Sequence, residues 1–167
     1  MDATLIRKFI EATQNLFGTM LQSTVSFGTP APTGQIETDG DVSGIIGFSG
    51  DVAGATVIRM PMATALGVVE SFCGEKFGEE TEDFADAIGE LANMICGGAK
   101  SSLENTNIDI SCPQVVIGSH HTVQTPSDAV SITIPCNAPQ GVFWIEISIR
   151  TGNAAAGAAN QSRAAAG

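Results

Sequence analysis

The chain has 167 residues, of which 43% are hydrophobic and 15% are charged. This length suits one domain with a substantial core, and the apolar fraction excludes a disordered chain. The 18 acidic residues outnumber the 7 basic ones, and the resulting net charge of -11 would repel a nucleic-acid backbone. No stretch reaches the roughly 18 apolar residues of a membrane span, and charges interrupt the N-terminal apolar residues as no signal peptide would. We expect a soluble, cytoplasmic domain with no nucleic-acid or membrane partner.

In the first 40 residues, apolar side chains recur at helical spacing from Ile6 to Leu21. This period predicts an amphipathic helix that ends near Leu21. The segment that follows is rich in Gly, Pro and Thr, which predicts a long loop with a short edge strand at Gln35–Thr38.

The next segment predicts a hairpin followed by a helix. Two β-rich runs, Val42–Phe48 and Ala55–Met60, flank the turn residues SGDVAG. The glycines of GFSGDVAG are therefore interpreted as a turn, because the GKS/T ending of a phosphate loop is missing. Pro61 stops the second strand, and a helical period then continues until Gly74 ends it.

A helix of about 20 residues is predicted from Phe84 to Leu103. Three extended runs come after it: IDISCPQVVIG, AVSITIPC and GVFWIEISIR. The turn residues NAPQG join the last two runs into a second hairpin. This order of elements predicts an α+β fold, with helices packed on a mostly antiparallel sheet built from hairpins. We assign residues 1–150 to a single domain and residues 151–167 to a flexible Ala/Gly-rich tail.

The cysteines and histidines predict no metal site. Four cysteines, Cys73, Cys96, Cys112 and Cys136, are irregularly spaced and form no CxxC pair. Free cysteine is among the most buried residue types, so we expect reduced and mostly buried thiols. His120 and His121 are adjacent, so on a strand they would point to opposite faces, and no further ligand lies at useful spacing.

The helix within DAIGELANMICGGAK has two different sides. At about 100° per residue, one stripe is apolar and the opposite side is polar. The apolar stripe is Phe84, Ile88, Leu91 and Ile95, and the polar front is Asp86, Glu90, Asn93 and Gly97, bordered by Gly89. Each helical glycine costs about 1 kcal/mol relative to alanine, so something has to come close there. Either a partner docks on this front, or the front is solvated and the glycines let a neighbouring helix pack tightly.

The stretch DAIGELANMICGGAKSSLE resembles the signature helix of the CheC, CheX and FliY phosphatases of bacterial chemotaxis. The family pattern is Asp or Ser, three residues, Glu, two residues and Asn, which Asp86, Glu90 and Asn93 fit. ISCPQVVIG is similar to the family's strand after this helix, and GDVAGATVIRMPMATALGVVESFCG is similar to its preceding hairpin and helix. The resemblance spans roughly Leu5 to Arg150 and implies a CheC/CheX-like fold.

CheC-like members carry the motif on two related helices. The N-terminal helix of this chain has Arg7, Glu11 and Gln14 at the corresponding spacing, so it lacks the first position and the Asn. A single motif points to the CheX branch, which implies a homodimer whose sheets join and an activity that removes the phosphoryl group from the response regulator CheY.

The resemblance also implies a division of roles. Glu90 and Asn93 are the expected catalytic residues: Asn93 orients the attacking water, and Glu90 anchors a lysine of the phosphorylated CheY-like regulator. Asp86, Gly89 and Gly97 are expected to contact that partner. The chain needs no cofactor of its own, because the regulator supplies Mg²⁺ beside its aspartyl phosphate. The alternative is a binding module that docks to a regulator or a flagellar component without hydrolysis.

Overall fold

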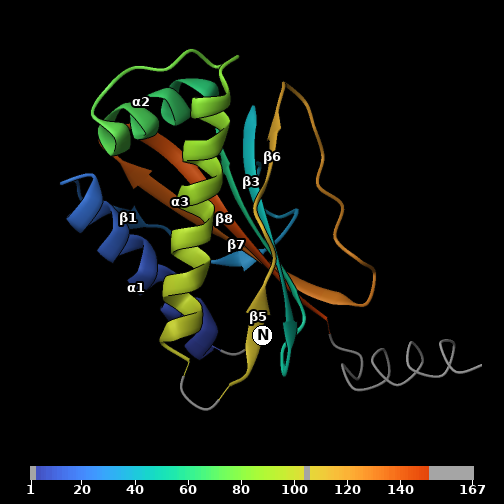
Figure 1. Ribbon diagram of the computed structural model, residues 1–167. Helices are drawn as coiled ribbons and strands as arrows, with labels where there is room; N and C mark the ends of the chain where they lie inside the picture. Colours follow the sequence, from blue (N-terminus) through green and yellow to red (C-terminus); the bar gives the residue numbers. More distant parts are fainter. Residues whose placement is uncertain (1–2, 104–105, 151–167) are drawn as a thin grey trace, which may run out of the picture.

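The computed structural model describes residues 3–103 and 106–150, in which helices cover one face of a sheet (Figure 1). The helices are α1 (Ala3–Met20), α2 (Met62–Cys73) and α3 (Glu82–Ser101). The strands are β1 (Ser26–Phe27), β2 (Ala31–Pro32), β3 (Val42–Gly50), β4 (Gly54–Met60), β5 (Ile108–Ile110), β6 (Gln114–Ile117), β7 (Ala129–Ala138) and β8 (Gly141–Arg150). The predicted α+β class is confirmed.

The sheet has the order β1-β7-β8-β4-β3-β5, with β2 also on β7 and β6 also on β3. Each of these pairs is antiparallel. Both predicted hairpins are present as β3–β4 and β7–β8. Gly141 begins β8 with a φ of 135°, a backbone conformation that favours glycine, at the tight β7–β8 turn.

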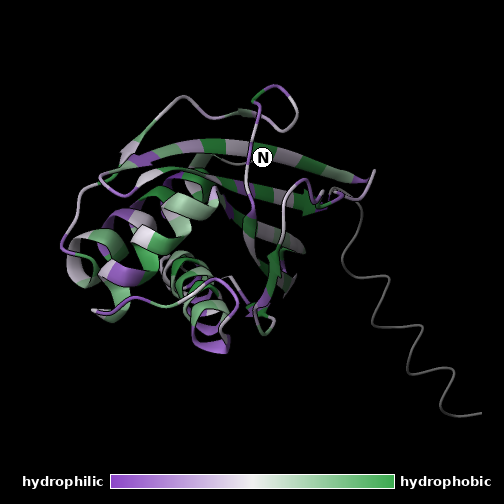
Figure 2. Ribbon diagram, turned by 90° about the horizontal axis from the view of Figure 1, so that it is seen from above, coloured by the Kyte–Doolittle hydropathy of each residue, from purple (hydrophilic) through white to green (hydrophobic). Residues whose placement is uncertain are grey.

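The core lies between the sheet and the helices, where apolar colouring is concentrated (Figure 2). Phe84 of α3 and Phe143 of β8 are among its largest fully buried side chains. Burial of a side chain of this size contributes roughly 1.5–3 kcal/mol. Phe143 stacks on Phe17 of α1, with ring centroids 5.2 Å apart, so the same strand also fixes the first helix.

Small residues let α3 approach its neighbours closely. A Cβ added at Gly98 would lie 3.1 Å from the Cβ of Ala12 in α1. A Cβ added at Gly44 of β3 would lie 2.9 Å from the Cβ of Ala92 in α3. The glycine that packs α3 against a neighbouring helix is therefore Gly98, which does not belong to the polar front.

The predicted edge strand at Gln35–Thr38 is wrong. The chain instead pairs with β7 earlier, through the short strands β1 and β2. A turn with Gly34 at a φ of 94° ends that pairing, and Thr38 then donates its hydroxyl to Glu146 Oε1 at 3.4 Å. The segment Gln35–Thr38 therefore contacts the sheet through the Thr38 side chain and not through backbone hydrogen bonds of a strand.

The predicted run IDISCPQVVIG is divided into β5 and β6, which pair with different parts of β3. Pro113 separates them, since proline has no N–H to donate to a ladder. Ser111 fixes the bend just before it: its N–H donates to the Gly47 carbonyl oxygen at 2.8 Å, and its Oγ accepts from the Gly47 N–H at 3.0 Å. Beyond β6, His120 lies in a turn and His121 directly after it, so neither is on a strand.

The cysteines differ from the expectation of mostly buried thiols. All four are free, but only Cys96 and Cys136 are buried, whereas Cys73 and Cys112 are exposed. Burial raises the pKa of the Cys96 thiol from 9.0 to about 12, and burial also raises the pKa of Cys136.

The predicted tail, residues 151–167, lies outside the described residues. No helix in the described part of the chain is long and apolar enough to cross a membrane.

Candidate functional site

The start of α3 is fixed by a side-chain cap. Thr81 precedes the helix in an extended conformation, and its hydroxyl accepts a hydrogen bond from the Phe84 N–H at 3.2 Å. This bond satisfies one of the free N–H groups of the first turn. Glu82 and Asp83 lie in that turn and Lys100 lies in the last, which complements the helix dipole at both ends. The helix is thereby well defined over the residues that carry the motif.

The two predicted sides of α3 are present in the structure. The stripe is buried: Phe84, Ile88, Leu91 and Ile95 are each exposed by 3% or less. Asp86 and Glu90 on the front are exposed, and Asn93 and Gly97 are half-buried. The structure therefore brings Asp86, Glu90, Asn93 and Gly97 onto one accessible face, since the opposite face packs on the sheet.

The polar side chains of this front are not used by the fold. Across residues 3–103 and 106–150, Asp86, Glu90 and Asn93 form no hydrogen bond or ion pair. Elsewhere in the chain, polar side chains at similar places on helices do find partners, as Lys8 and Glu11 do at 2.9 Å on α1. The amide and the carboxylates are thus available to a group from outside.

Gly97 in the front and Gly89 at its border have different surroundings. Gly89 is buried, and a Cβ added there would lie 3.2 Å from Cγ of Pro113 and 3.5 Å from Cγ2 of Val115. A Cβ added at Gly97 would have no atom of the described residues within 4 Å. Close packing by the chain's own β6 segment accounts for Gly89, whereas the fold gives no packing reason for Gly97.

A hollow of about 520 Å³ lies beside the motif, between α3 and β6. It is lined by Ala85, Asp86, Gly89, Glu90, Pro113 and Val115. Neither Pro113 nor Val115, both within ISCPQVVIG, was predicted from the sequence as a site residue. That proline was the available signal, because it interrupts an otherwise extended apolar run.

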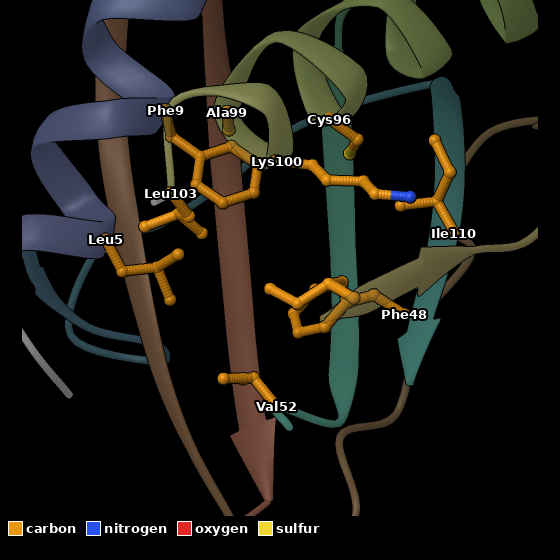
Figure 3. Close-up of a pocket in the computed structure, with 10 residues that line it drawn as sticks. Leu5, Phe9, Phe48, Val52, Cys96, Ala99, Lys100, Leu103 and Ile110 are labelled. Atoms are coloured by element: carbon orange, nitrogen blue, oxygen red, sulfur yellow. The ribbon is translucent and has the colours of Figure 1, made fainter. Parts of the chain in front are cut away.

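An apolar cavity lies at the other end of α3, where Phe9, Phe48 and Leu103 point into one space (Figure 3). Its volume is about 20 Å³, which is room for about one water molecule. Lys100 crosses its mouth, with its aliphatic stem along the apolar wall (Figure 3). This space is a packing defect and too small for a ligand.

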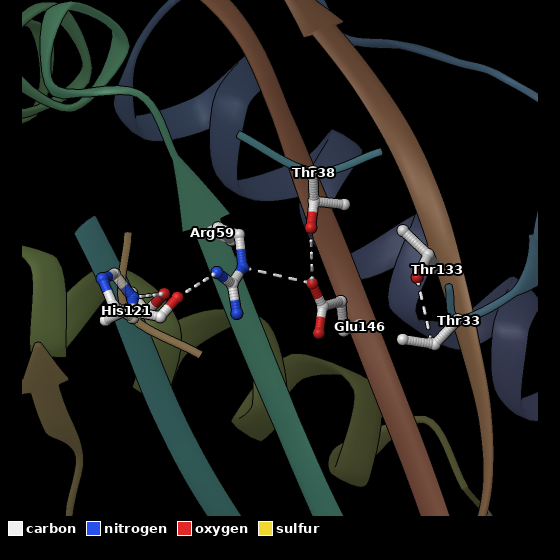
Figure 4. Close-up of polar contacts among 7 residues, drawn as sticks. Thr33, Thr38, Arg59, His121, Thr133 and Glu146 are labelled. Atoms are coloured by element: carbon white, nitrogen blue, oxygen red, sulfur yellow. Dashed lines mark hydrogen bonds and ion pairs between the residues drawn. The ribbon is translucent and has the colours of Figure 1, made fainter. Parts of the chain in front are cut away.

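A polar cluster lies on the sheet face opposite the helices (Figure 4). Arg59 and Glu146 form a buried ion pair, with 3.2 Å between Nε and Oε1. Arg59 Nη1 also donates to the carbonyl oxygen of His121 at 3.1 Å, and the His121 Nε2 atom lies 2.7 Å from Ser43 Oγ. Together with the hydrogen bond from Thr38 to Glu146, these contacts tie two surface segments to the sheet. No group of three potential metal ligands occurs among the described residues.

The profile of the family described as chemotaxis phosphatase CheX matches residues 42–137, which include all of α3. The chain belongs to the CheX family. A curated CheX relative, the CheY-P phosphatase CheX of Thermotoga maritima, is 27% identical over 156 residues, covering 91% of this chain and 99% of the relative. The motif on α3 therefore lies within a match that extends along almost the whole of both chains.

Solved CheX structures have the same fold. The chemotaxis protein CheX of Vibrio vulnificus is 29% identical, with a TM-score of 0.81 over 89% of this chain and 100% of that one. CheX in a complex with CheY, BeF3 and Mg from Borrelia burgdorferi is 24% identical, with a TM-score of 0.72 over 87% of this chain and 97% of that one. At that identity, the Borrelia structure supports the fold alone.

Proposed function

We propose that the chain is a phosphatase that hydrolyses the aspartyl phosphate of a CheY-like response regulator. The observation that carries this proposal is the pair of unpartnered side chains Glu90 and Asn93, one helical turn apart on the accessible face of α3. The CheX family and the name of the Thermotoga relative support the substrate class.

The reaction is the attack of a water oxygen on the phosphorus atom. The bond between phosphorus and the aspartyl oxygen breaks, the partner's carboxylate is restored, and the water proton passes to the departing phosphate. The transition state is loose, so the position of the water matters more than a strong base. Holding that water in line accounts for the catalytic effect of a well-placed amide.

Asn93 has the chemistry for this task. Its carbonyl oxygen accepts a hydrogen bond from the water, and its NH₂ group donates one to an oxygen of the phosphoryl group. A neutral amide adds no negative charge beside the phosphoryl oxygens, as a carboxylate would. Because Asn93 is half-buried, its side chain has fewer rotamers to lose than a fully exposed one.

Glu90 has the chemistry of an anchor. Its exposed carboxylate pairs with the lysine that lies beside the aspartyl phosphate of the regulator, and this pair sets α3 over the phosphate. Asp86 lies one turn before Glu90 and contacts the partner further from the phosphate. Gly97 leaves room for a partner loop, and Gly89 contributes to the hollow beside Glu90.

The partner supplies the metal ion. Mg²⁺ bound beside the aspartyl phosphate neutralises the phosphoryl oxygens, and the proposed phosphatase contributes no metal ligand. A homodimer in which the sheets of two copies join is part of the proposal, since edge strands present unpaired backbone groups. A cytoplasmic location follows from the proposed partner.

The test is the decay of a phosphorylated regulator. A CheY-like regulator from the same organism is labelled with radioactive acetyl phosphate in Mg²⁺, purified, and followed with and without this protein. The proposal predicts accelerated loss of label that is proportional to the protein concentration. An unchanged or slower decay would contradict it, and would favour a binding module that docks to a regulator or a flagellar component without hydrolysis.

A further inference from the structure

We propose that Pro113 and Val115 form a second wall of the docking surface, so that a basic side chain of the regulator lies in the hollow between α3 and β6. This inference rests on the proposed function and adds specificity-determining residues that lie outside the motif. It assigns to the hollow the aliphatic stem of a second basic residue of the regulator, a lysine or arginine other than the lysine that Glu90 anchors, with its charged end at Asp86.

The floor of the hollow is apolar. Four residues line this apolar part: Ala85 and Gly89 on the α3 wall, and Pro113 and Val115 on the second wall. Pro113 is exposed and Val115 is half-buried, so both can still lose water when a partner arrives. An apolar floor of this kind suits methylene groups, because their burial removes apolar surface from water.

The rim of the hollow is acidic. Asp86 and Glu90 are both exposed, and neither is paired within the described residues. Among the described residues no basic side chain lines the hollow, and the whole chain has a net charge of -11. An apolar floor with carboxylates at the rim complements a side chain that has an aliphatic stem and a cationic end.

The two walls are fixed relative to each other before any partner binds. Pro113 lies against Gly89, and Val115 pairs with Gly44 in the β3–β6 ladder. The bend before Pro113 is fixed by the two hydrogen bonds between Ser111 and Gly47. A preformed hollow costs little ordering on binding, which favours affinity for the side chain that fits it.

The experiment compares opposite charges at the same place. Pro113→Lys puts a cation into the hollow, where it competes with the partner's basic side chain. Pro113→Glu instead adds a third carboxylate beside those of Asp86 and Glu90, on a side chain of similar size to lysine. Gln114→Lys is the control. It adds the same positive charge as Pro113→Lys, but Gln114 lines a groove on the opposite sheet face. Apparent affinity and maximal rate are measured from single-turnover decay of the labelled regulator, with melting temperatures to show that each variant folds.

The expected result is a weaker apparent affinity for Pro113→Lys than for Pro113→Glu by about tenfold or more, with a difference that shrinks at high salt. The maximal rate should change far less than the affinity, and Gln114→Lys should behave as wild type. Equal affinities for Pro113→Lys and Pro113→Glu would overturn the inference, because bulk or folding alone treats the two alike.

A second pair of variants does not depend on β6. Ala85→Lys and Ala85→Glu place the same charges on the α3 wall, and the same ordering of affinities is expected. Failure of the inference is distinct from failure of the proposed function. If only the inference fails, the wild-type protein accelerates dephosphorylation, and the Lys and Glu variants at each position have equal affinities. If the proposed function fails, the wild-type protein does not accelerate dephosphorylation.

Discussion

The ring of Pro113 lies against Gly89 of α3, so closely that a Cβ at the glycine would meet Cγ of the proline at 3.2 Å. This contact joins the β6 segment to the helix that carries Glu90, and it explains a glycine in the middle of a long helix. Cβ atoms in proteins rarely approach other heavy atoms this closely, so α3 or the Pro113 segment has to shift when a methyl group is added at Gly89.

Gly97→Ala is expected to raise the free energy of unfolding by about 0.5–1 kcal/mol, because alanine favours a helix and no described residue lies within 4 Å of the new methyl group. Gly89→Ala should gain less or be destabilised, since the same preference is opposed by the Pro113 contact. Urea unfolding of both variants measures the difference. Equal gains in stability would show that the β6 segment yields freely and that the contact does not fix it.

The buried pair Arg59 and Glu146 gives a second prediction about stability. Each side chain is only 8% exposed, so Glu146→Leu leaves a buried guanidinium without its counter-charge and should cost about 3–5 kcal/mol. Arg59→Met together with Glu146→Leu should recover most of that loss, because no unpaired charge remains. Urea unfolding of the single and double variants measures this. A double variant as unstable as the single one would contradict the argument.

Stability should fall with pH above about 9. Burial raises the pKa of Cys96 to about 12 and also raises that of Cys136, so above pH 9 the unfolded chain loses thiol protons that the folded chain keeps. The stabilisation is therefore complete below the unfolded pKa and is lost by up to about 1.4 kcal/mol per pH unit for each thiol. The chain has no tyrosine, so no phenol titrates in this range.

Unfolding by urea at pH 8, 9 and 10 measures this loss. Cys96→Ala is the control variant, and it should show a shallower decline with pH whatever its stability at pH 8. A decline of the same slope in Cys96→Ala would assign the effect to other groups.

Much of the fold could be predicted from the sequence, because it depends on local periodicity. The stripe from Phe84 to Ile95 and the β-rich runs of both hairpins are visible without tertiary information. The strands β1 and β2 were not predicted, since segments of two residues exist only through their pairing with β7. Long periodic elements could therefore be predicted, and short edge strands could not.

The candidate site was predicted in part for the same reason. Glu90 and Asn93 share a face by helical spacing alone, so the sequence places them together. The hollow beside them depends on how β6 pairs with β3 and where Pro113 meets Gly89, which is a tertiary relationship. No spacing rule relates those residues. The buried pair Arg59 and Glu146 was missed because neither residue interrupts the alternation of its strand.

Glu90→Ala is expected to weaken the binding of the phosphorylated regulator and to lower the rate of its dephosphorylation, because the anchor for the partner's lysine is lost. Glu90 is exposed, so the loss of affinity should shrink as salt rises. Glu11→Ala is the control: it removes one exposed carboxylate from α1 and should leave the affinity unchanged. A Glu90→Ala protein that loses rate at saturation but no affinity would contradict the anchoring role.

The role of Asn93 is tested most directly by single-turnover decay of the labelled regulator with Asn93→Ala at several phosphatase concentrations, which separates affinity from maximal rate. If Asn93 orients the water, Asn93→Ala still binds the regulator while its maximal rate falls by about 100-fold or more. Asn93→Asp should do no better, because a carboxylate beside the phosphoryl oxygens adds repulsion. An Asn93→Ala protein that keeps most of its maximal rate would contradict the mechanism and leave the front of α3 as a docking surface.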